Sequence, residues 1–301
     1  QNLGFEPGYF IGGVLEEGPS SRLGKGNYFF IESDEYDSGY FEKISKLRLY
    51  ELDHMVLTSL EFDHADIFKN IDDIKDQFRP ALKTLNGSLI YDESYRAAQE
   101  LVSEVKDQKS LRAVSAYGLI ASQGPEIIEM AEQGTKFLLS YRGKKELFQT
   151  NLVGKHNILN LSSCLIFCDH EGVELSKAKE AVVHLKLVKR RQEVRGRLGE
   201  AVVIDDFAHH PKAVELTLDG IRVKYPKHKL TVVFEPHSAT ARSSLFQEEF
   251  TSALSAADHI YITKPLRPTS VTFAKDLDIK KLVNDLEKKD KVSAVVESLV
   301  E

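Results

Sequence analysis

The feature that most constrains the fold is an alternation of short apolar runs and longer helical runs in the C-terminal part of the chain. The apolar runs at residues 201–204 (AVVI), 230–234 (LTVVF) and 259–263 (HIYIT) are typical of buried strands. Helical sequence separates them at residues 211–224 and 244–256. Because strands separated by helices pair in parallel through right-handed crossovers, this part of the chain is predicted to form an α/β domain.

The preceding part of the chain shows the same two kinds of pattern. Strands are predicted at residues 28–32, 54–59, 88–91, 111–115 and 136–140, and helices at 71–82, 157–168, 174–187 and from 277 onward. A chain of 301 residues is long enough for two domains. We therefore expect an α/β protein with a central, mostly parallel sheet domain flanked by helices over residues 1–188, and a smaller domain over 189–301.

Composition narrows the classes of function. The formal net charge of −6 argues against a nucleic-acid-binding protein, since such proteins usually carry a basic surface. No run approaches the roughly 20 apolar residues of a membrane span, and no secretory signal is visible. We therefore expect neither a nucleic acid nor a membrane as a partner. Cys164 and Cys168 share a predicted helix face, where buried thiols are common, and this cysteine usage suits the reducing cytoplasm.

Acidic side chains gather where two predicted strands end. His64 lies between Asp63 and Asp66 after the second strand, and Glu32 opens the run IESDEYD after the first. A histidine with carboxylates suits a cation such as Mg²⁺ or Mn²⁺, which also relieves the repulsion between clustered carboxylates. The competing interpretation of residues 61–66 is a helix cap whose acidic residues are favoured by the helix dipole. Because both strand ends are expected in one sheet, we favour a metal site.

Further polar segments lie at the ends of other predicted elements. Gly154 permits a tight start to the helix that follows, and Asn157 and Asn160 share a face where their amides either read an adenine edge or cap the helix. The run KRRQEVRGR at 189–197 offers guanidinium groups to phosphate, or forms a solvated linker. The segments DDFAHHP at 205–211 and EPHS at 235–238 each follow a strand, which fits a ligand-binding crevice.

Taken in order, these motifs resemble those of the Mur ligase family across nearly the whole chain. The family pattern has an acidic strand end, a DH-x-D motif, a G-x-HN-x-x-N helix start, a basic RR segment and a DD-x-AHHP segment. Here the motifs read IESDEYD, FDHADIF, GKHNILN, KRRQEVRG and DDFAHHP. Each motif is weak alone, but all of them in the family order form a specific signal. Within the family, the last two motifs point to ligases that act on UDP-N-acetylmuramate.

The resemblance implies a cytoplasmic ligase that forms an amide bond through an acyl phosphate, with ATP and Mg²⁺. It also implies the family's central ATPase-type domain over residues 1–188 and its Rossmann-like C-terminal domain over 189–301. By matched position, the resemblance implies that Glu32 and His64 are Mg²⁺ ligands supported by Asp66. It implies that Asn157 and Asn160 contact adenine beside His156, that Arg191 binds the ATP phosphates, and that Asp206 contacts the ribose or a water. The residues implied to contact the muramyl peptide are His209, His210 and His237. His64, Asp66 and Arg191 are the residues implied to be catalytic.

Two groups within the family fit the chain. The segments EPGYFIGGV, EYD, SK, LEFDHADIF and EPHSAT are similar to the murein-recycling ligases, the last one through the pattern EP-x-S-x-T. These ligases attach the tripeptide L-alanyl-γ-D-glutamyl-meso-diaminopimelate to UDP-N-acetylmuramate. His237 is similar to the alanine-adding ligases of peptidoglycan synthesis, although these more often carry arginine where Ser238 stands. We favour the recycling reaction, with UDP-N-acetylmuramate and the murein tripeptide as small-molecule substrates.

The chain also departs from the family pattern. Ser59 stands where the family usually has asparagine, and no G-x-x-G-K-[ST] phosphate loop occurs in the sequence. In the family that loop precedes the segment with which this sequence begins. We therefore interpret the chain as a piece of a longer protein and expect these residues alone to be inactive. The alternatives are the alanine-adding ligase, another family ligase such as the polyglutamate-adding folate enzyme, and a non-catalytic nucleotide-binding module.

Overall fold

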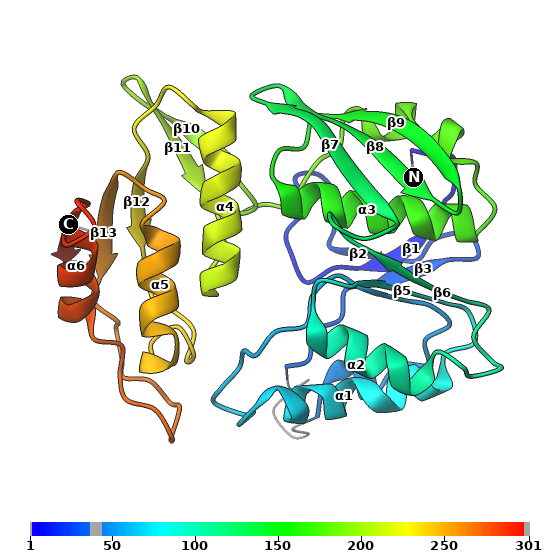
Figure 1. The fold of residues 1–301 in the computed structure, drawn as a ribbon, viewed down its shortest axis with the longest axis horizontal. Coiled ribbons are helices and arrows are strands. Elements are labelled where there is room, and N and C mark those ends of the chain that lie inside the picture. Colours follow the sequence, from blue (N-terminus) through cyan, green and yellow to red (C-terminus); the bar gives the residue numbers. More distant parts are fainter. Residues whose placement is uncertain (1, 37–43, 298–301) are drawn as a thin grey trace. The chain divides into compact units, whose positions relative to one another are not determined.

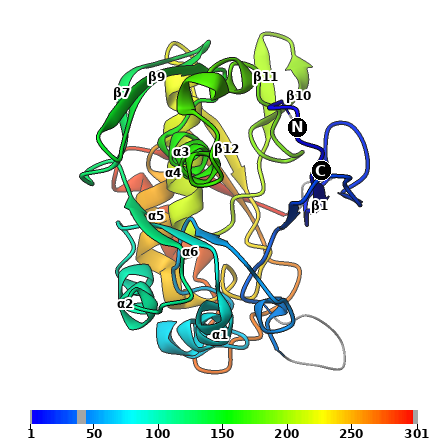
Figure 2. The same ribbon diagram turned by 90° about the vertical axis from the view of Figure 1, so that its right-hand side faces the viewer.

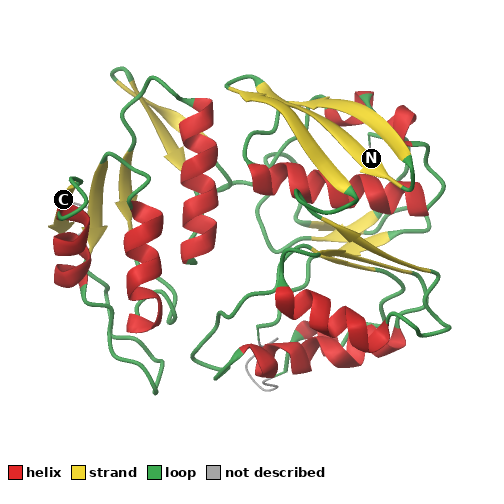
Figure 3. Ribbon diagram, in the orientation of Figure 1, coloured by secondary structure: helices red, strands yellow, loops and turns green. Residues whose placement is uncertain are grey.

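The structure is a computed structural model that describes residues 2–36 and 44–297. The chain divides into two compact units. The first unit comprises Gln1–Phe62 and Asn70–Lys189, and the second comprises Asp63–Lys69 and Arg190–Glu301. Both units combine helices with parallel strands, which confirms the predicted α/β class (Figures 1 and 3). The segment Asp63–Lys69 groups with the second unit, whereas the sequence places it within residues 1–188.

Helix α3 (Lys155–His170) lies at the centre of the first unit, between two sheets (Figure 1). The strands are Met55–Leu57 (β4), Ser88–Asp92 (β5) and Ala113–Tyr117 (β6) in a parallel sheet, and Gly124–Ala131 (β7), Gly134–Tyr141 (β8) and Lys144–Thr150 (β9) in an antiparallel sheet. Ile158 belongs to the same core as Phe137 of β8, while Ile166 packs with Ile90 of β5. A helix that is apolar on opposite faces is buried on both, so α3 joins the two sheets.

Helices α1 (Ile71–Thr84) and α2 (Arg96–Val105) pack against each other, and α2 contacts β5. Figures 1 and 2 show the antiparallel sheet, α3, the parallel sheet and this helix pair as successive layers of the first unit. Asn70 begins α1, because its side chain accepts hydrogen bonds from Asp72 N at 2.8 Å and Asp73 N at 3.1 Å.

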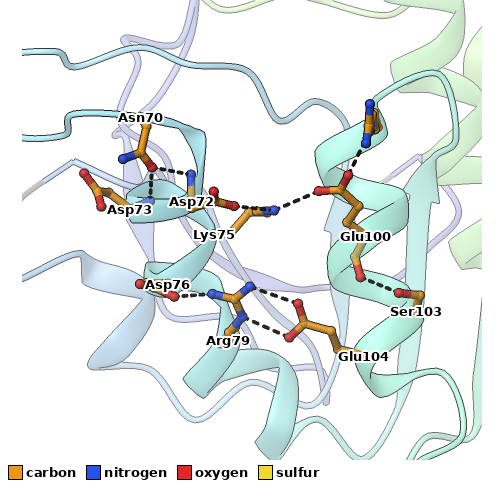
Figure 4. A network of polar contacts seen from close by, with 10 residues as sticks. Asn70, Asp72, Asp73, Lys75, Asp76, Arg79, Glu100, Ser103 and Glu104 are labelled. Atoms are coloured by element: carbon orange, nitrogen blue, oxygen red, sulfur yellow. Dashed lines mark hydrogen bonds and ion pairs between the residues drawn. The ribbon is translucent and has the colours of Figure 1, made fainter.

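Two cations of α1 join it to α2 (Figure 4). Lys75 is buried, and its Nζ donates to Glu100 Oε2 at 2.8 Å. Arg79 donates to both carboxylate oxygens of Glu104 at 2.9 Å and also contacts Asp76. Lys75 is buried but Glu100 is partly exposed, so loss of Glu100 would leave a buried cation with Asp72 as its remaining ion-pair partner.

A separate small sheet lies near the start of the chain. Its strands are Gly8–Phe10 (β1), Ser21–Arg22 (β2) and Phe29–Ile31 (β3), and β1 pairs with both of the others. The acidic run after β3 and the acidic run after β4 therefore follow strands of different sheets. The prediction that these two strand ends share one sheet is wrong. Asp37, the last carboxylate of the first run, lies outside the described residues.

The second unit contains the alternation from which the fold class was predicted. Its elements are the antiparallel hairpin Glu193–Leu198 (β10) and Ala201–Asp205 (β11), the parallel strands Thr231–Phe234 (β12), His259–Thr263 (β13) and Val292–Val296 (β14), and the helices Pro211–Lys224 (α4), Gln247–Leu254 (α5) and Ile279–Glu287 (α6). Leu218, Phe250 and Leu282 bring one side of each helix into a common core. Proline at the first position of α4 explains why that boundary is readable from sequence.

Several local predictions fail. The prediction of a helix over residues 174–187 is wrong, because only the short 3₁₀ turns Leu175–Ala178 and Glu180–Val182 form there. Asn151 binds the backbone of the following residues instead, through Val183 O at 3.0 Å and through both backbone groups of Leu185 at 2.8 Å. The Cys164 side chain is exposed, so the expectation that both cysteines are buried is also wrong.

No helix in the described part of the chain is both long enough and apolar enough to cross a bilayer.

Candidate functional site

The segment Asp63–Lys69 holds His64 in an uncommon backbone conformation. The φ angle of His64 is +53°, in the left-handed region that residues other than glycine rarely adopt. Asp63 Oδ1 accepts from His64 N at 2.7 Å, and the His64 carbonyl accepts from Ile67 N at 2.9 Å and Phe68 N at 3.0 Å. Such a conformation costs about 1–3 kcal/mol and persists where the surroundings enforce it, often at functional sites. It supports a functional role for His64.

Contacts within the second unit place this segment beside the loops after β11 and β12. Ala65 N donates to Thr240 Oγ1 at 2.9 Å, and both residues are buried. The second oxygen of Asp63 lies 3.8 Å from His209 Nε2. His209 Nδ1 lies 3.0 Å from the carbonyl oxygen of Phe207, so it is the nitrogen that donates. In a neutral ring Nε2 then carries the lone pair, and this nitrogen lies 3.8 Å from the Asp63 oxygen.

The predicted phosphate-binding arginine lies in a turn with two left-handed residues. The φ angles of Arg190 and Gln192, on either side of Arg191, are +59° and +51°. Phe207 N donates to the Arg190 carbonyl at 2.8 Å and holds the turn against the loop after β11. The guanidinium carbons of Arg190 and Arg191 lie 5.0 and 5.6 Å from the centre of the Phe207 ring. Stacking on a ring face leaves guanidinium N–H groups at the edge, where they are able to bind an anion.

Asp206 connects this turn to the start of α4. One of its oxygens accepts from Gln192 N at 2.8 Å. The other accepts from Ala208 N at 2.8 Å and from Thr217 Oγ1 at 3.3 Å. The Asp206 carboxylate therefore orders two loops, and its contact with ribose or a water stays a prediction.

The other two predicted site histidines of the second unit, His210 and His237, differ in environment. His210 caps α4, since its Nδ1 accepts from Lys212 N at 3.3 Å, and its ring packs against Phe246 at 4.9 Å between centres. The side chain of His237 is 75% exposed, with its Nδ1 3.5 Å from Glu235 Oε1. His237 is thus accessible to a ligand, whereas His210 has a structural task. Their contact with the muramyl peptide stays a prediction.

The first unit carries the other predicted site residues. Glu32 is exposed, and its Oε2 accepts from Gly12 N at 2.8 Å. Gly154 precedes α3 with a φ of +104°, as its predicted role in a tight turn requires. Asn157 is buried and donates to the Val153 carbonyl at 2.8 Å, while Asn160 is exposed and His156 is partly buried. The adenine contacts of these three side chains stay a prediction.

Glu32 and Asp66 offer carboxylate oxygens, which suit Mg²⁺, and the role of Glu32 and His64 as its ligands stays a prediction. Among the residues that the structure describes, no three His, Cys, Asp or Glu side chains are grouped to hold a metal ion. Glu32 uses one oxygen for Gly12, which leaves the other for a cation. Asp63 and Asp66 flank His64 with further oxygen donors, the atom type that Mg²⁺ prefers.

Three residues of the second unit make contacts near the predicted site residues, but the sequence assigned them no role: Phe207, Thr240 and Arg242. Phe207 lies inside the DDFAHHP motif, where an aromatic residue beside two arginines is a readable signal. Thr240 and Arg242 follow the EPHS segment, and only the tertiary structure reveals that both are buried. Burial lowers the pKa of Arg242, and so does the nearby charge of Arg267, while the Asp66 carboxylate opposes the change.

Comparisons with known proteins agree on one family. Residues 21–168 match the Mur ligase middle domain, and residues 190–301 match the Mur ligase glutamate ligase domain. The UDP-N-acetylmuramate–L-alanyl-γ-D-glutamyl-meso-2,6-diaminoheptandioate ligase of Haemophilus influenzae is 32% identical over 87% of this chain and 58% of its own length. The UDP-N-acetylmuramate–L-alanine ligase of Lactococcus lactis is 30% identical over 83% of this chain and 54% of its own. This chain thus spans little more than half of these relatives.

A solved structure also shares the fold. The UDP-N-acetylmuramate–alanine ligase of Thermotoga maritima superimposes with a TM-score of 0.73 at 21% identity, over 99% of this chain and 62% of that one.

Proposed function

Because this chain belongs to the Mur ligase family, we propose that it supplies the middle and C-terminal parts of an ATP-dependent ligase of peptidoglycan recycling. The proposed reaction joins the tripeptide L-alanyl-γ-D-glutamyl-meso-diaminopimelate to UDP-N-acetylmuramate. One relative is named for this reaction, and the motifs LEFDHADIF and EYD favour the same group. Since ATP and UDP-linked sugars are cytoplasmic metabolites, the proposal places the enzyme in the cytoplasm.

The observation that carries the proposal is the convergence of three motifs in the second unit. The strained turn of His64 lies against His209 through Asp63, and Phe207 of the same DDFAHHP motif stacks with Arg191. A histidine beside a carboxylate is able to move a proton, and a guanidinium is able to neutralise phosphate charge, which are two contributions that phosphoryl and acyl transfer use.

The proposed chemistry has two steps. The muramyl carboxylate attacks the γ-phosphorus of ATP, which forms an acyl phosphate and releases ADP. The α-amine of the tripeptide then attacks the acyl carbon, so that the amide bond forms and inorganic phosphate leaves. Most of the catalysis in such reactions comes from positioning and from neutralising charge.

The residues of this chain would divide that work. Arg191 would neutralise phosphate charge from its place on Phe207. His209 Nε2 would take the proton of the attacking amine, and Asp63 at 3.8 Å would stabilise the resulting imidazolium. Glu32 and His64 are the proposed Mg²⁺ ligands, and the ion when bound would supply further positive charge to the phosphates.

The test is phosphate release by the full-length protein that contains this chain, with ATP, Mg²⁺ and UDP-N-acetylmuramate. We expect turnover with the tripeptide and little with L-alanine. An Arg191→Lys variant, which keeps the charge but loses the planar stacking group, should turn over at least tenfold more slowly. Turnover with L-alanine alone would reject the recycling assignment, and no turnover with either amine would favour a non-catalytic nucleotide-binding module.

A second candidate is addition of L-alanine to UDP-N-acetylmuramate. His237 directly follows Pro236, as in the alanine-adding group, and the exposed imidazole is accessible to a ligand. A relative of similar identity is named for that reaction. The comparison of amines in the same assay distinguishes the two candidates.

A further inference from the structure

The turn that follows the EPHS segment is ordered by its own hydrogen bonds. Arg242 N donates to the Ser238 carbonyl at 3.0 Å, and Ser243 N donates to the Thr240 carbonyl at 3.0 Å. The Arg242 carbonyl accepts from Leu277 N at 2.7 Å, which ties the turn to the segment that leads into α6. The turn is therefore a rigid support rather than a free loop.

Thr240 presents its side chain from this support to the histidine segment. Its Oγ1 accepts the backbone hydrogen bond of Ala65 at 2.9 Å, and Thr240 and Ala65 are only 2% and 3% exposed. A buried N–H group that loses its acceptor is costly, so this bond constrains where Ala65 lies. Ala65 directly follows His64, whose backbone is left-handed.

Arg242 adds charge to the same support. It is 5% exposed, its guanidinium contacts the His237 carbonyl, and its Nε makes no hydrogen bond within the described residues. The carboxylates of Asp66 and Asp276 act on its charge from nearby. The hydrogen bond from Ala65 N to Thr240 Oγ1 is thus the contact through which this support holds the segment.

We propose that Thr240 is a positioning residue that fixes His64 for the ligase reaction by anchoring the backbone of Ala65. The inference rests on the proposed function for its catalytic consequence. The anchoring itself is independent of that function, because it depends only on the contacts within the second unit.

The test compares three variants of the full-length protein. Thr240→Val keeps the shape of the side chain but removes the acceptor, and Thr240→Ser retains the acceptor. Thr269→Val is the matched control, because Thr269 Oγ1 donates at 2.7 Å to the Ala239 carbonyl of the same turn and, in the described structure, makes no hydrogen bond to residues 63–69. Amide hydrogen exchange of residues 62–69 and the kinetics of phosphate release are measured for each variant.

We expect Thr240→Val to accelerate exchange at Ala65 about tenfold, in line with the loss of one buried hydrogen bond. The apparent affinity for Mg²⁺ in turnover should fall about tenfold, while KM for UDP-N-acetylmuramate stays within about twofold. Thr240→Ser should retain both properties, and Thr269→Val should leave both unchanged.

Other outcomes decide against the inference. Equal exchange at Ala65 in Thr240→Val and in the unmodified protein would refute the anchor. Faster exchange with unchanged turnover would refute the positioning role. If the unmodified protein does not ligate at all, the proposed function fails, and the exchange measurement alone then decides whether Thr240 anchors the segment.

Discussion

His170 in the first unit predicts a specific loss of stability in mild acid. Its Nε2 lies 3.1 Å from Ser115 Oγ and contacts the hydroxyl of Tyr141, while its Nδ1 is buried without a hydrogen-bond partner in the described structure. Burial, together with the nearby charge of Arg142, lowers the pKa of His170 from 6.5 to about 4. The folded protein therefore holds this ring neutral at a pH where an unfolded chain has already protonated it.

The folded and unfolded states differ in proton binding at His170, and this difference sets the direction in which stability changes with pH. Between pH 6.5 and about 4 the unfolded chain binds a proton at His170 and the folded protein does not, so stability falls as the pH falls through this interval. Each pH unit corresponds to about 1.4 kcal/mol, which sets an upper limit of about 3 kcal/mol. Because His170 is partly exposed, solvent screening reduces the expected loss to about 1–2 kcal/mol.

The assay is urea unfolding at pH 7, 5.5 and 4.5 for the unmodified protein and for His170→Gln. Glutamine retains an acceptor for the Tyr141 hydroxyl but does not titrate, so the carboxylates that also titrate in this range contribute equally to both proteins. We expect the stability difference between the two proteins to shift by about 1–2 kcal/mol toward the variant as the pH falls. NMR titration of the His170 ring should independently give a pKa near 4. A difference that does not change with pH, or a ring that titrates near 6.5, would refute the reasoning.

Three further predictions concern single residues. Glu100→Gln should lower the midpoint of urea unfolding, because Lys75 is only 6% exposed and loses one of its two carboxylate partners. An unchanged midpoint would show that Asp72 suffices as the partner of Lys75. Gly154→Ala should lower the melting temperature more than Gly172→Ala: both glycines have positive φ, but a Cβ at 154 would meet the His156 ring at 2.9 Å, whereas 172 is open. Phe207→Leu should raise KM for ATP in the full-length enzyme several-fold, because it removes the ring on which Arg190 and Arg191 stack. An unaltered KM would show that these arginines do not contribute to nucleotide binding.

Local signals in the sequence are enough to predict elements whose own residues determine their ends. Helix α4 spans Pro211–Lys224 as predicted, because proline, the capping His210 and the apolar spacing all act within one or two turns. Strand β13 spans His259–Thr263, as its apolar run predicts. The order of motifs also suffices for the family, since each motif is a short stretch of adjacent residues.

Elements that depend on distant partners were not readable. Residues 174–187 have helical spacing, but they form two short 3₁₀ turns, and the side chain of Asn151 binds the backbone of Leu185 after these turns. The helix predicted from residue 277 onward ends at Glu287, and strand β14 (Val292–Val296), which has no fully buried residue, pairs with β13. In both cases the hydrogen-bond partners of the segment lie far away from it in the sequence.

By itself, the sequence determined the α/β class, the family and the chemical character of the candidate site residues. Three facts came from the tertiary structure alone: β3 and β4 belong to different sheets, Asp63–Lys69 packs with the second unit, and Ala65 N donates to Thr240 Oγ1. The physical reason is range. Propensity, capping and periodicity act over a few residues, whereas sheet pairing and burial join positions such as 65 and 240 that no local pattern relates.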